Sequence, residues 1–426
     1  MRTIRSFAAV AIVAGALTLG GCADWLSVEN PTVIDNAALD PVADADLLAR
    51  SAQQNLSSAY GHLIVYSSWF TGETDVSETF PTRNEFGRRD ISIQNGSLDN
   101  DVWFPVSQTA ASAYLVLNAT LPNPTTNLNY ARANFVLGYA YLFMAEQFCQ
   151  GTVLAGPPLT TADMLDSAAA HFALAISQGD GAGGQGTAIA DAALVGTARA
   201  ELQRGNLAAA ITAANSVPAG FIFNLTYIDD LAQRFRLANR MWFYVRDRGS
   251  IAVAPIWRIG AELPPTQVQT AEPRVPWRVT AATGDFAPQD AFYATDRGVP
   301  YAIQQKYPDY NVPVRLASKL EADYIVAEAQ GTAAQQTLID ARRAANGQAA
   351  YGGATDSLSI LTEFFTQRGF DFFLEGKRLG DFRRHPAHIA GMPVPASTYW
   401  KPGFATVGSN VCYPLPITET DNNPNF

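Results

Sequence analysis

The sequence has little of the residues that most often carry out chemistry in protein sites. Its 426 residues include four histidines and three cysteines. Only His385 and His388 lie close together, and Pro386 between them disrupts the helical spacing that would present both to one metal ion. The motifs of P-loop nucleotide-binding proteins, zinc proteases and G-x-S-x-G hydrolases are absent. We therefore expect no metal, no cofactor and no catalytic residues, so that the protein is not an enzyme.

Long apolar runs are also scarce, and the one at the N-terminus is too short to span a bilayer as a helix. It follows two arginines and covers about 13 residues at 7–19, against the roughly 20 required. Two glycines and Cys22 come next, an ending that resembles a bacterial lipobox. We predict a lipoprotein signal peptide at residues 1–21, followed by acylation of Cys22. An ordinary signal peptide with a chance cysteine, or a buried N-terminal helix, are the alternatives.

Basic residues are outnumbered, because 29 Lys and Arg face 39 Asp and Glu, for a formal net charge of −10. Removal of residues 1–21, which carry two arginines, takes that charge to −12. An acidic surface argues against nucleic acid and against a docking patch for anionic lipids. The remaining chain of about 405 residues is long enough for one large domain or two modest ones. No later segment approaches 18 uncharged apolar residues, so we expect no membrane-spanning helix there.

The two other cysteines, Cys149 and Cys412, would lie in an exported compartment that permits disulfides. Their positions in the sequence do not show whether their Cα atoms come within bridging distance. Two alternatives stay open, a long-range Cys149–Cys412 disulfide and two buried free thiols.

Stretches with an apolar or alanine-rich face and without internal proline predict a mostly helical chain. They cover residues 44–58, 132–148, 161–177, 188–203, 207–216, 316–330, 333–346 and 358–374. Consecutive helices at 131–148 and 161–177, at 188–203 and 207–216, and at 316–330 and 333–346 resemble tetratricopeptide units. Residues 66–108, 218–315 and the tail after Pro386 lack helical periodicity and predict long loops. The expected fold is mostly α, with tetratricopeptide-like helix pairs packed beside a loop-rich half.

An acidic cluster in the first predicted loop is a candidate site for sugars. Glu73, Asp75 and Glu78 lie near Trp69 and Trp103. Three interpretations are open: catalytic carboxylates as in a glycosidase, carboxylates that accept hydrogen bonds from sugar hydroxyls, and a solvated loop. Aromatic faces stack on sugar rings, although most loop aromatics only fasten a loop to its scaffold. The aromatic residues of the non-helical segments are Trp69, Phe70, Trp103, Phe104, Trp257, Trp277, Tyr293, Tyr301, Tyr307 and Tyr310.

Five segments, in order along the chain, resemble those of the SusD/RagB family of outer-membrane nutrient-binding lipoproteins. CADWLSVENP at 22–31 resembles that family's leader after the lipid, and YPLPITETDNNP at 413–424 resembles its P-I-P-x-x-E…N-P close. ARANFVLGYAYLF at 131–143 resembles R-x-x-R-A-x-x-Y, and LASKLEADYIVAEA at 316–329 resembles R-Y-A-E-V-L-L-I-Y-A-E-A. RGFDFFLEGKRLGDFR at 368–383 resembles R-x-x-E-L-x-x-E-G-x-R-x-x-D-L-R. Asp371 stands where that family usually has Glu, and Asn134 where it usually has Arg.

The resemblance implies one SusD-like domain at residues 22–426, an α-α superhelix of four tetratricopeptide-like units beside a variable, loop-rich half. Its N-terminal part, about 22–215, would hold helical pairs, and its C-terminal part, about 316–426, the signature segments. The family's ligand region corresponds to about 69–103, which makes four residues in it candidate ligand contacts. These residues are Trp69, Glu73, Asp75 and Trp103.

The last signature segment has charged residues at helical spacing. Glu375, Arg378 and Asp381 fall at i, i+3 and i+6, which suits ion pairing along a helix or at its end. We interpret these three residues as scaffold rather than as ligand contacts.

The function that the resemblance implies is nutrient binding without chemistry. A lipid on Cys22 would hold the protein at the surface of the outer membrane, beside a SusC-like TonB-dependent transporter that receives an oligosaccharide or another nutrient. Residue 23 is Ala rather than Asp, so the strongest inner-membrane retention signal is absent. The alternative is a tetratricopeptide-type envelope scaffold that assembles proteins and binds no small molecule. A lipid-anchored glycosidase comes third, because the sequence offers no convincing acid/base pair.

Overall fold

The computed structural model describes residues 39–265, 267–280 and 301–426. The predicted signal peptide, Cys22 and Tyr293 lie outside these ranges. The chain divides into two units, Met1–Asp44 and Ala45–Phe426. In the described part of the first unit, the Asp40 side chain accepts hydrogen bonds from two backbone N–H groups and so forms a turn. Among the described helices, none combines the length and the apolar character needed to cross a membrane.

The second unit is mostly helical, as the sequence predicts. The α-helices are α2 (Ala45–Phe70), α3 (Pro81–Gly87), α4 (Phe104–Leu117), α5 (Leu128–Gln147), α6 (Thr161–Ala182), α7 (Gln185–Arg204), α8 (Leu207–Asn215), α9 (Arg234–Leu237), α10 (Arg240–Arg246), α12 (Lys319–Gln330), α13 (Thr332–Ala345), α14 (Ser357–Asp371), α15 (Arg378–Arg384) and α16 (Ile417–Asn422). Shorter turns are the π-helix η3 (Leu98–Trp103) and the 3₁₀ helices η4 (Pro255–Trp257) and η5 (Pro386–His388). Two-stranded antiparallel ribbons join β1 (Thr74–Val76) to β3 (Ile251–Val253), β2 (Ile222–Leu225) to β6 (Val314–Ser318), and β4 (Trp277–Val279) to β5 (Ala302–Gln304).

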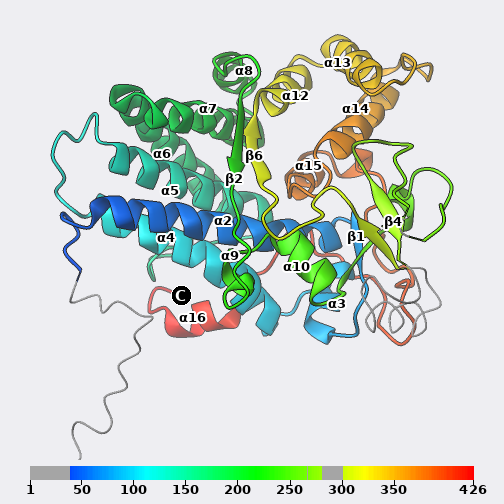
Figure 1. The fold of residues 1–426 in the computed structure, drawn as a ribbon, viewed down its shortest axis with the longest axis horizontal. Helices are drawn as coiled ribbons and strands as arrows, with labels where there is room; N and C mark the ends of the chain where they lie inside the picture. Colours follow the sequence, from blue (N-terminus) through cyan, green and yellow to red (C-terminus); the bar gives the residue numbers. More distant parts are fainter. Residues whose placement is uncertain (1–38, 266, 281–300) are drawn as a thin grey trace, which may run out of the picture. The chain divides into compact units, whose positions relative to one another are not determined.

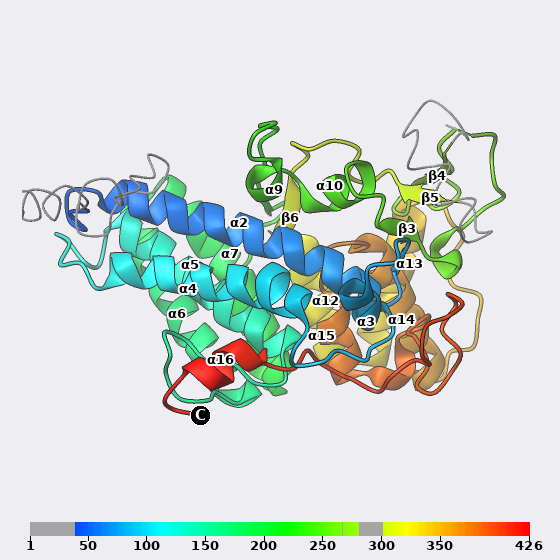
Figure 2. The same cartoon turned by 90° about the horizontal axis from the view of Figure 1, so that it is seen from below.

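The predicted helix pairs are present. Helices α5 and α6, α7 and α8, and α12 and α13 pack against each other, and Figure 1 shows α5 to α8 stacked in succession. Helices α2 and α4 form a further pair that the sequence did not indicate, and Figure 2 shows them side by side over α5. The helical pairs therefore form one layered scaffold, and the ribbons lie in the segments that connect it.

Close approach of three helices depends on two glycines that face one ring. A Cβ atom added to Gly138 of α5 would lie 2.5 Å from the Phe172 ring of α6, and one added to Gly196 of α7 would lie 2.4 Å from the same ring. Phe172 is fully buried. Because no side chain of any size fits at either glycine, the ring of Phe172 sets the spacing of α5, α6 and α7.

The prediction of a long loop at 66–108 is wrong for much of its length. Helix α2 continues to Phe70, η3 begins at Leu98 and α4 begins at Phe104. The second half of α2 is buried on nearly all sides, including Ser67 and Ser68. A helix that is buried all round shows no amphipathic period, so its polar residues read as a loop in the sequence.

Buried charges connect the helical pairs to the segment before α15. The carboxylate of Glu146 in α5 accepts hydrogen bonds from Arg199 in α7, whose guanidinium lies 3.6 Å from Glu321 in α12. The Nζ atom of Lys377 lies 2.7 Å from the other oxygen of Glu321 and donates to the carbonyl of Leu316. Burial lowers the pKa of Lys377 to about 8, and Glu321 limits that shift. Four charges that lie inside the protein thus hold α5, α7, α12 and Lys377 together.

In the segment at 368–384, the three charges at helical spacing do not pair with one another along one helix. Helix α14 ends at Asp371 and α15 begins at Arg378, because Leu374 and Gly376 have positive φ angles that end helical geometry. Glu375 instead pairs with Lys306 and Arg315. Residues at 375–378 therefore reach three different parts of the fold from an extended turn.

Substitution of Gly138 by Ala tests the packing at Phe172. Alanine in a helix is ordinarily more stable than glycine, but here its Cβ would overlap a ring that cannot move aside. We expect Gly138→Ala to lower the free energy of unfolding by about 1–3 kcal/mol in urea denaturation. Gly96→Ala is the matched control, because Gly96 is helical and has nothing within 4 Å of an added Cβ. Equal effects of the two substitutions would contradict this account.

Candidate functional site

A cavity of about 330 Å³ lies where three segments far apart in the sequence meet. Its walls come from 69–87 around β1, from residues 254–256, and from the tail at 391–407. Apolar side chains form most of the wall, among them Pro255, Ile256 and Pro393, with Ser397 and Thr398 as hydroxyl groups. Ile256 is 54% exposed, so the wall is open to solvent on that side. Ligand cavities combine an apolar wall with a few polar groups in this way.

The β1–β3 ribbon places Asp75 at the cavity. Asp75 lies opposite Ala252 in the ribbon, and backbone hydrogen bonds continue it at both ends, from Ser77 to Ser250 and from Ala254 to Glu73. Three-residue strands are too short to be stable alone. The ribbon is held by its packing on α2, where the hydroxyls of Ser68 and Thr74 lie 2.6 Å apart.

The carboxylate of Asp75 is a partly buried group in an apolar wall. Burial raises its pKa to about 6, and the cations of Arg258 and Lys401 limit that rise. Arg258 itself is fixed by a hydrogen bond from its Nε atom to the carbonyl of Val253. Near neutral pH the cavity therefore holds a carboxylate that can accept hydrogen bonds from a ligand, and this group changes charge within the physiological range.

Trp400 reaches the cavity on a loop of the tail. The loop closes on itself, because Ala396 and Val407 are joined by a 2.8 Å backbone hydrogen bond. Beside Trp400, the buried ammonium of Lys401 donates to the carbonyls of Val76 and Glu78, which fastens the loop to β1. The tail and the strand that carries Asp75 are thereby held together.

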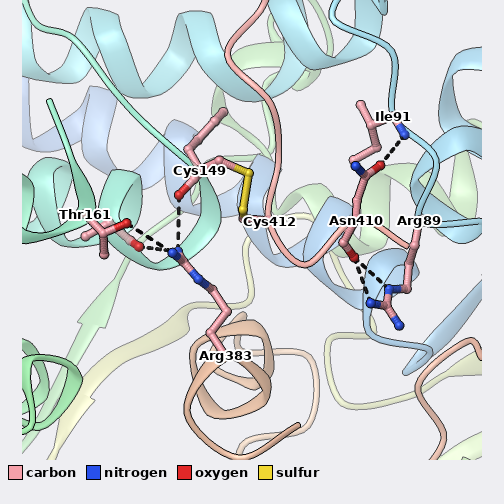
Figure 3. Close-up of a disulfide and its surroundings, with 9 residues drawn as sticks. Arg89, Ile91, Cys149, Thr161, Arg383, Asn410 and Cys412 are labelled. Atoms are coloured by element: carbon pink, nitrogen blue, oxygen red, sulfur yellow. Dashed lines mark hydrogen bonds between the residues drawn. A yellow bond between two sulfur atoms is a disulfide. The ribbon is translucent and has the colours of Figure 1, made fainter. Parts of the chain in front are cut away.

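A disulfide and an arginine hold the base of the tail (Figure 3). Cys149, just after α5, is bonded to Cys412 with 5.2 Å between their Cα atoms, so the structure has the disulfide rather than two free thiols. Arg89 donates from Nε and Nη2 to the carbonyl of Asn410 and from Nη1 to that of Pro393. These contacts fix the tail before the Trp400 loop, at Pro393, and after it, at Asn410 and Cys412.

Two of the four predicted ligand residues line this cavity. Trp69 and Asp75 both contribute to its wall. Trp69 is only 1% exposed, and its indole N–H has no hydrogen-bond partner among the described residues. An edge of Trp69 and the carboxylate of Asp75 are therefore the parts of the predicted set that the structure brings together.

The other two predicted ligand residues have structural partners instead. Glu73 is 1% exposed and accepts a 3.0 Å hydrogen bond from the backbone N–H of Leu374. Burial raises the pKa of Glu73, and Arg378 opposes that rise. Trp103 is 2% exposed and donates its indole N–H to Glu419 of α16. Neither side chain contributes to the cavity wall, so the structure gives both a scaffold role.

Sequence reasoning missed the contribution of the tail. Tyr399 and Trp400 were part of a segment predicted only as loop, and neither was singled out among the loop aromatics. The signal was present, because two consecutive aromatic residues stand between Thr398 and Lys401 in a segment rich in proline and glycine. Nothing in the sequence shows that this segment folds back against β1.

Among the described residues, no group of three or more His, Cys, Asp and Glu side chains could hold a metal ion. The cavity wall contains a carboxylate, hydroxyls and the indole of Trp400, which suit a polar organic ligand with apolar faces.

Substitution of Asp75 by Asn tests whether the ionised carboxylate lowers the free energy of unfolding. The pKa of Asp75 in the folded protein lies above its usual value of 3.8, so the protonated side chain stabilises the fold fully below pH 3.8. This stabilisation is lost as the pH rises through about 6. Asparagine does not titrate. We expect Asp75→Asn to raise the free energy of unfolding by about 2 kcal/mol at pH 8 and by little at pH 4.

Urea denaturation of both proteins at the two pH values measures this difference. Asp421→Asn is the control, since Asp421 is exposed in α16 and its replacement should matter little at either pH. A difference between Asp75→Asn and the unchanged protein that is the same at pH 4 and pH 8 would rule out the assigned role.

No protein-family model and no curated protein matches this chain. Solved structures do match. A SusD-like carbohydrate-binding protein from Bacteroides fragilis is 14% identical, with a TM-score of 0.64 over 90% of this chain and 98% of the other. A SusD/RagB family protein from Bacteroides thetaiotaomicron is 13% identical, with a TM-score of 0.62 over 90% and 95% of the two chains.

Surface glycan-binding protein A from Bacteroides thetaiotaomicron, solved in complex with laminarihexaose, is a further match. It is 12% identical, with a TM-score of 0.61 over 90% of this chain and 98% of the other. These matches run nearly end to end in both partners, although few residues are identical. This chain therefore has the SusD fold, which confirms the resemblance to the SusD/RagB family predicted from its sequence.

Proposed function

We propose that this protein binds an oligosaccharide in the cavity beside Asp75 and Trp400 and carries out no reaction on it. The single observation that supports this most is the combination of an indole side chain, a carboxylate and the hydroxyls of Ser397 and Thr398 in one largely apolar cavity. Sugars present apolar ring faces and hydroxyl edges, and this set of groups matches both. A solved structure with the same fold contains laminarihexaose, which supports the same ligand class.

Binding is favoured over hydrolysis by the number of carboxylates. Glycosidases use two carboxyl groups on either side of the scissile bond, about 5–9.5 Å apart. Of the acidic cluster Glu73, Asp75 and Glu78, only Asp75 belongs to the cavity wall. Glu73 accepts a hydrogen bond from the backbone of Leu374, and Glu78 pairs with Arg83. The cavity also lies among loops rather than along the helical pairs, which favours a ligand-binding protein over the tetratricopeptide-type scaffold.

Titration with oligosaccharides tests the proposal. We expect saturable binding of at least one member of a panel that includes laminarihexaose, measured by isothermal calorimetry. Trp400→Ala should weaken that binding about tenfold, since loss of an aromatic platform costs on the order of 1 kcal/mol or more. Phe426→Ala is the control, because Phe426 is an exposed aromatic residue outside the cavity.

The pH dependence of binding identifies the role of Asp75. Below about pH 6 its carboxyl group is protonated and accepts hydrogen bonds more weakly. Affinity should therefore fall between pH 8 and pH 5 in the unchanged protein and stay flat in Asp75→Asn. Chromatography of the incubated oligosaccharides provides the second criterion, because shorter products would show an enzyme and overturn the proposal.

We further propose that a lipid on Cys22 anchors the protein at the surface of the outer membrane, where it delivers its ligand to a SusC-like TonB-dependent transporter. The sequence supports the anchor through the basic start, the short apolar run and the glycines before Cys22. The SusD fold supports the transport role, because the resemblance that predicted the fold also implies this partner.

Replacement of Cys22 tests the anchor in cells. Cys22→Ser removes the acylated residue, so the protein should pass from the outer-membrane fraction to the soluble fraction, as followed by immunoblot. The unchanged protein should incorporate a labelled fatty acid and co-purify with a large β-barrel protein after mild detergent extraction. Cys149→Ser is the cysteine control, since it removes the Cys149–Cys412 disulfide without touching the anchor. Membrane retention of Cys22→Ser would contradict the proposal.

A further inference from the structure

A second cavity, of about 610 Å³, lies apart from the Asp75 cavity and shares no wall residue with it. It lies where the β2–β6 ribbon, α13 and the end of α14 meet a loop at 273–276. Its size is that of a small-ligand site. Its wall differs from that of the first cavity, because charged side chains from five segments converge on it.

Four cations and two acids line this second cavity. Arg274, Lys306, Arg315 and Arg342 supply the cations, and Asp371 and Glu375 supply the acids. Four positive and two negative charges leave a formal excess of +2 in the wall. Glu272 pairs with Arg274 from behind and reduces that excess to +1. A net positive cavity is unexpected in a chain whose formal charge is −10, and it would attract an anion locally.

The acids orient the arginines and leave part of each guanidinium available. Arg342 donates from Nε and Nη2 to the two oxygens of Asp371, each at 2.8 Å. Arg315 donates from Nε and Nη2 to Glu375 and from Nη2 also to the Asp371 carbonyl. Among the described residues, no hydrogen bond engages Nη1 of either arginine. Each guanidinium is thus held rigidly by one edge, which is the arrangement that recognises an oxyanion with the other.

Two polar groups in the same wall have no hydrogen-bond partner. The Oη atom of Tyr307 and the Nη1 atom of Arg274 are buried and make no hydrogen bond among the described residues, although Nη1 of Arg274 lies 3.4 Å from Oδ1 of Asp371 in an ion pair. Tyr307 is 4% exposed as a residue, and the side chain of Arg274 is 8% exposed. Buried donors without an acceptor are rare in folded proteins, because each costs about 1–3 kcal/mol. Each of these two groups therefore keeps a hydrogen-bonding capacity that no described residue uses.

Glu375 does not cancel a neighbouring cation by taking up a proton. Burial would raise the pKa of Glu375, but attraction to Lys306 and Arg315 outweighs it and lowers the pKa to about 2. Glu375 is therefore charged at neutral pH, and its two oxygens are already engaged by Lys306 and Arg315. The carboxylate of Asp371 is likewise occupied by Arg342 and by the hydroxyl of Tyr324. The oxygens of both acids therefore accept hydrogen bonds from protein groups and are not available to a ligand.

We propose that this second cavity binds an oxyanionic group, a sulfate or a carboxylate, through Arg315, Arg342 and Lys306. The group belongs either to a free inorganic anion or to an acidic saccharide, and both present the same charged oxygens to the guanidinium edges. The site is independent of neutral-glycan binding beside Asp75, so either can fail without the other.

Calorimetric titration with sodium sulfate and with glucuronic acid, at constant ionic strength set with sodium chloride, tests the site. We expect saturable binding of at least one probe at one site per chain. Arg342→Gln should weaken it at least about tenfold, because a charge-assisted hydrogen bond is removed. Arg343→Gln is a closely matched control, since Arg343 is the next residue of α13, has similar exposure and pairs with Glu363 outside the cavity.

A second pair of variants guards against a variant that does not fold. Lys306→Gln should weaken binding of the probe, whereas Lys319→Gln should not, because Lys319 pairs with Asp323 and does not line the cavity. Binding of sulfate alone assigns the free anion as the source, and tighter binding of glucuronic acid assigns an acidic saccharide. The proposal is overturned if neither probe saturates, or if the control variants weaken binding as much as Arg342→Gln and Lys306→Gln. Neutral oligosaccharide titrations on the same variants report the Asp75 cavity separately.

Discussion

The buried ammonium of Lys377 is the constraint on which the positions of both cavities depend. It lies 2.7 Å from Glu321, which in turn faces Arg199 and so belongs to the interior of the helical layer. Breaking a buried ion pair leaves an uncompensated charge and costs several kcal/mol, so the chain cannot shift by one residue here. With Lys377 fixed, Glu375 is placed against Lys306 and Arg315, and Arg378 donates to the Thr71 carbonyl beneath the Asp75 cavity. Four consecutive residues thereby join the scaffold to both candidate sites.

Carboxylates that lie close together in the sequence have opposite roles because their surroundings differ. Glu73 accepts a backbone N–H from Leu374 and is closed off, whereas Asp75, two residues later, borders a cavity. The raised pKa of Asp75 means that the fold is destabilised above pH 6 by keeping this group ionised. Groups held at such a cost are concentrated at functional sites, where an uncharged side chain would stabilise the fold but not serve the ligand.

The sequence predicted the helical scaffold well and the candidate site only in part, for a physical reason. Helix α6 begins with a capping box of Thr160 and Asp163 and ends at Gly183, and α7 ends at Gly205. Such signals act over a few residues, so the positions of these helices can be read locally. The cavity combines Asp75 with Trp400, more than 300 residues away, and no local pattern reports such a contact. The contact of Trp103 with Glu419 could not be predicted for the same reason, because these residues lie at opposite ends of the chain. The Cys149–Cys412 disulfide, whose cysteines are 263 residues apart, could be named from the sequence only as one of two alternatives.

The same long-range contacts also determine how the candidate site can bind. A loop that becomes ordered only on binding subtracts its lost conformational freedom from the affinity. Here Arg89 holds the tail at Pro393 and again at Asn410, and the disulfide follows at Cys412. Lys401 fixes the middle of the loop on β1. The conformational cost of presenting Trp400 is therefore met during folding rather than during ligand binding. A cavity built in this way is pre-formed, and its affinity depends on how well a ligand matches the indole, the hydroxyls and the carboxylate already in place.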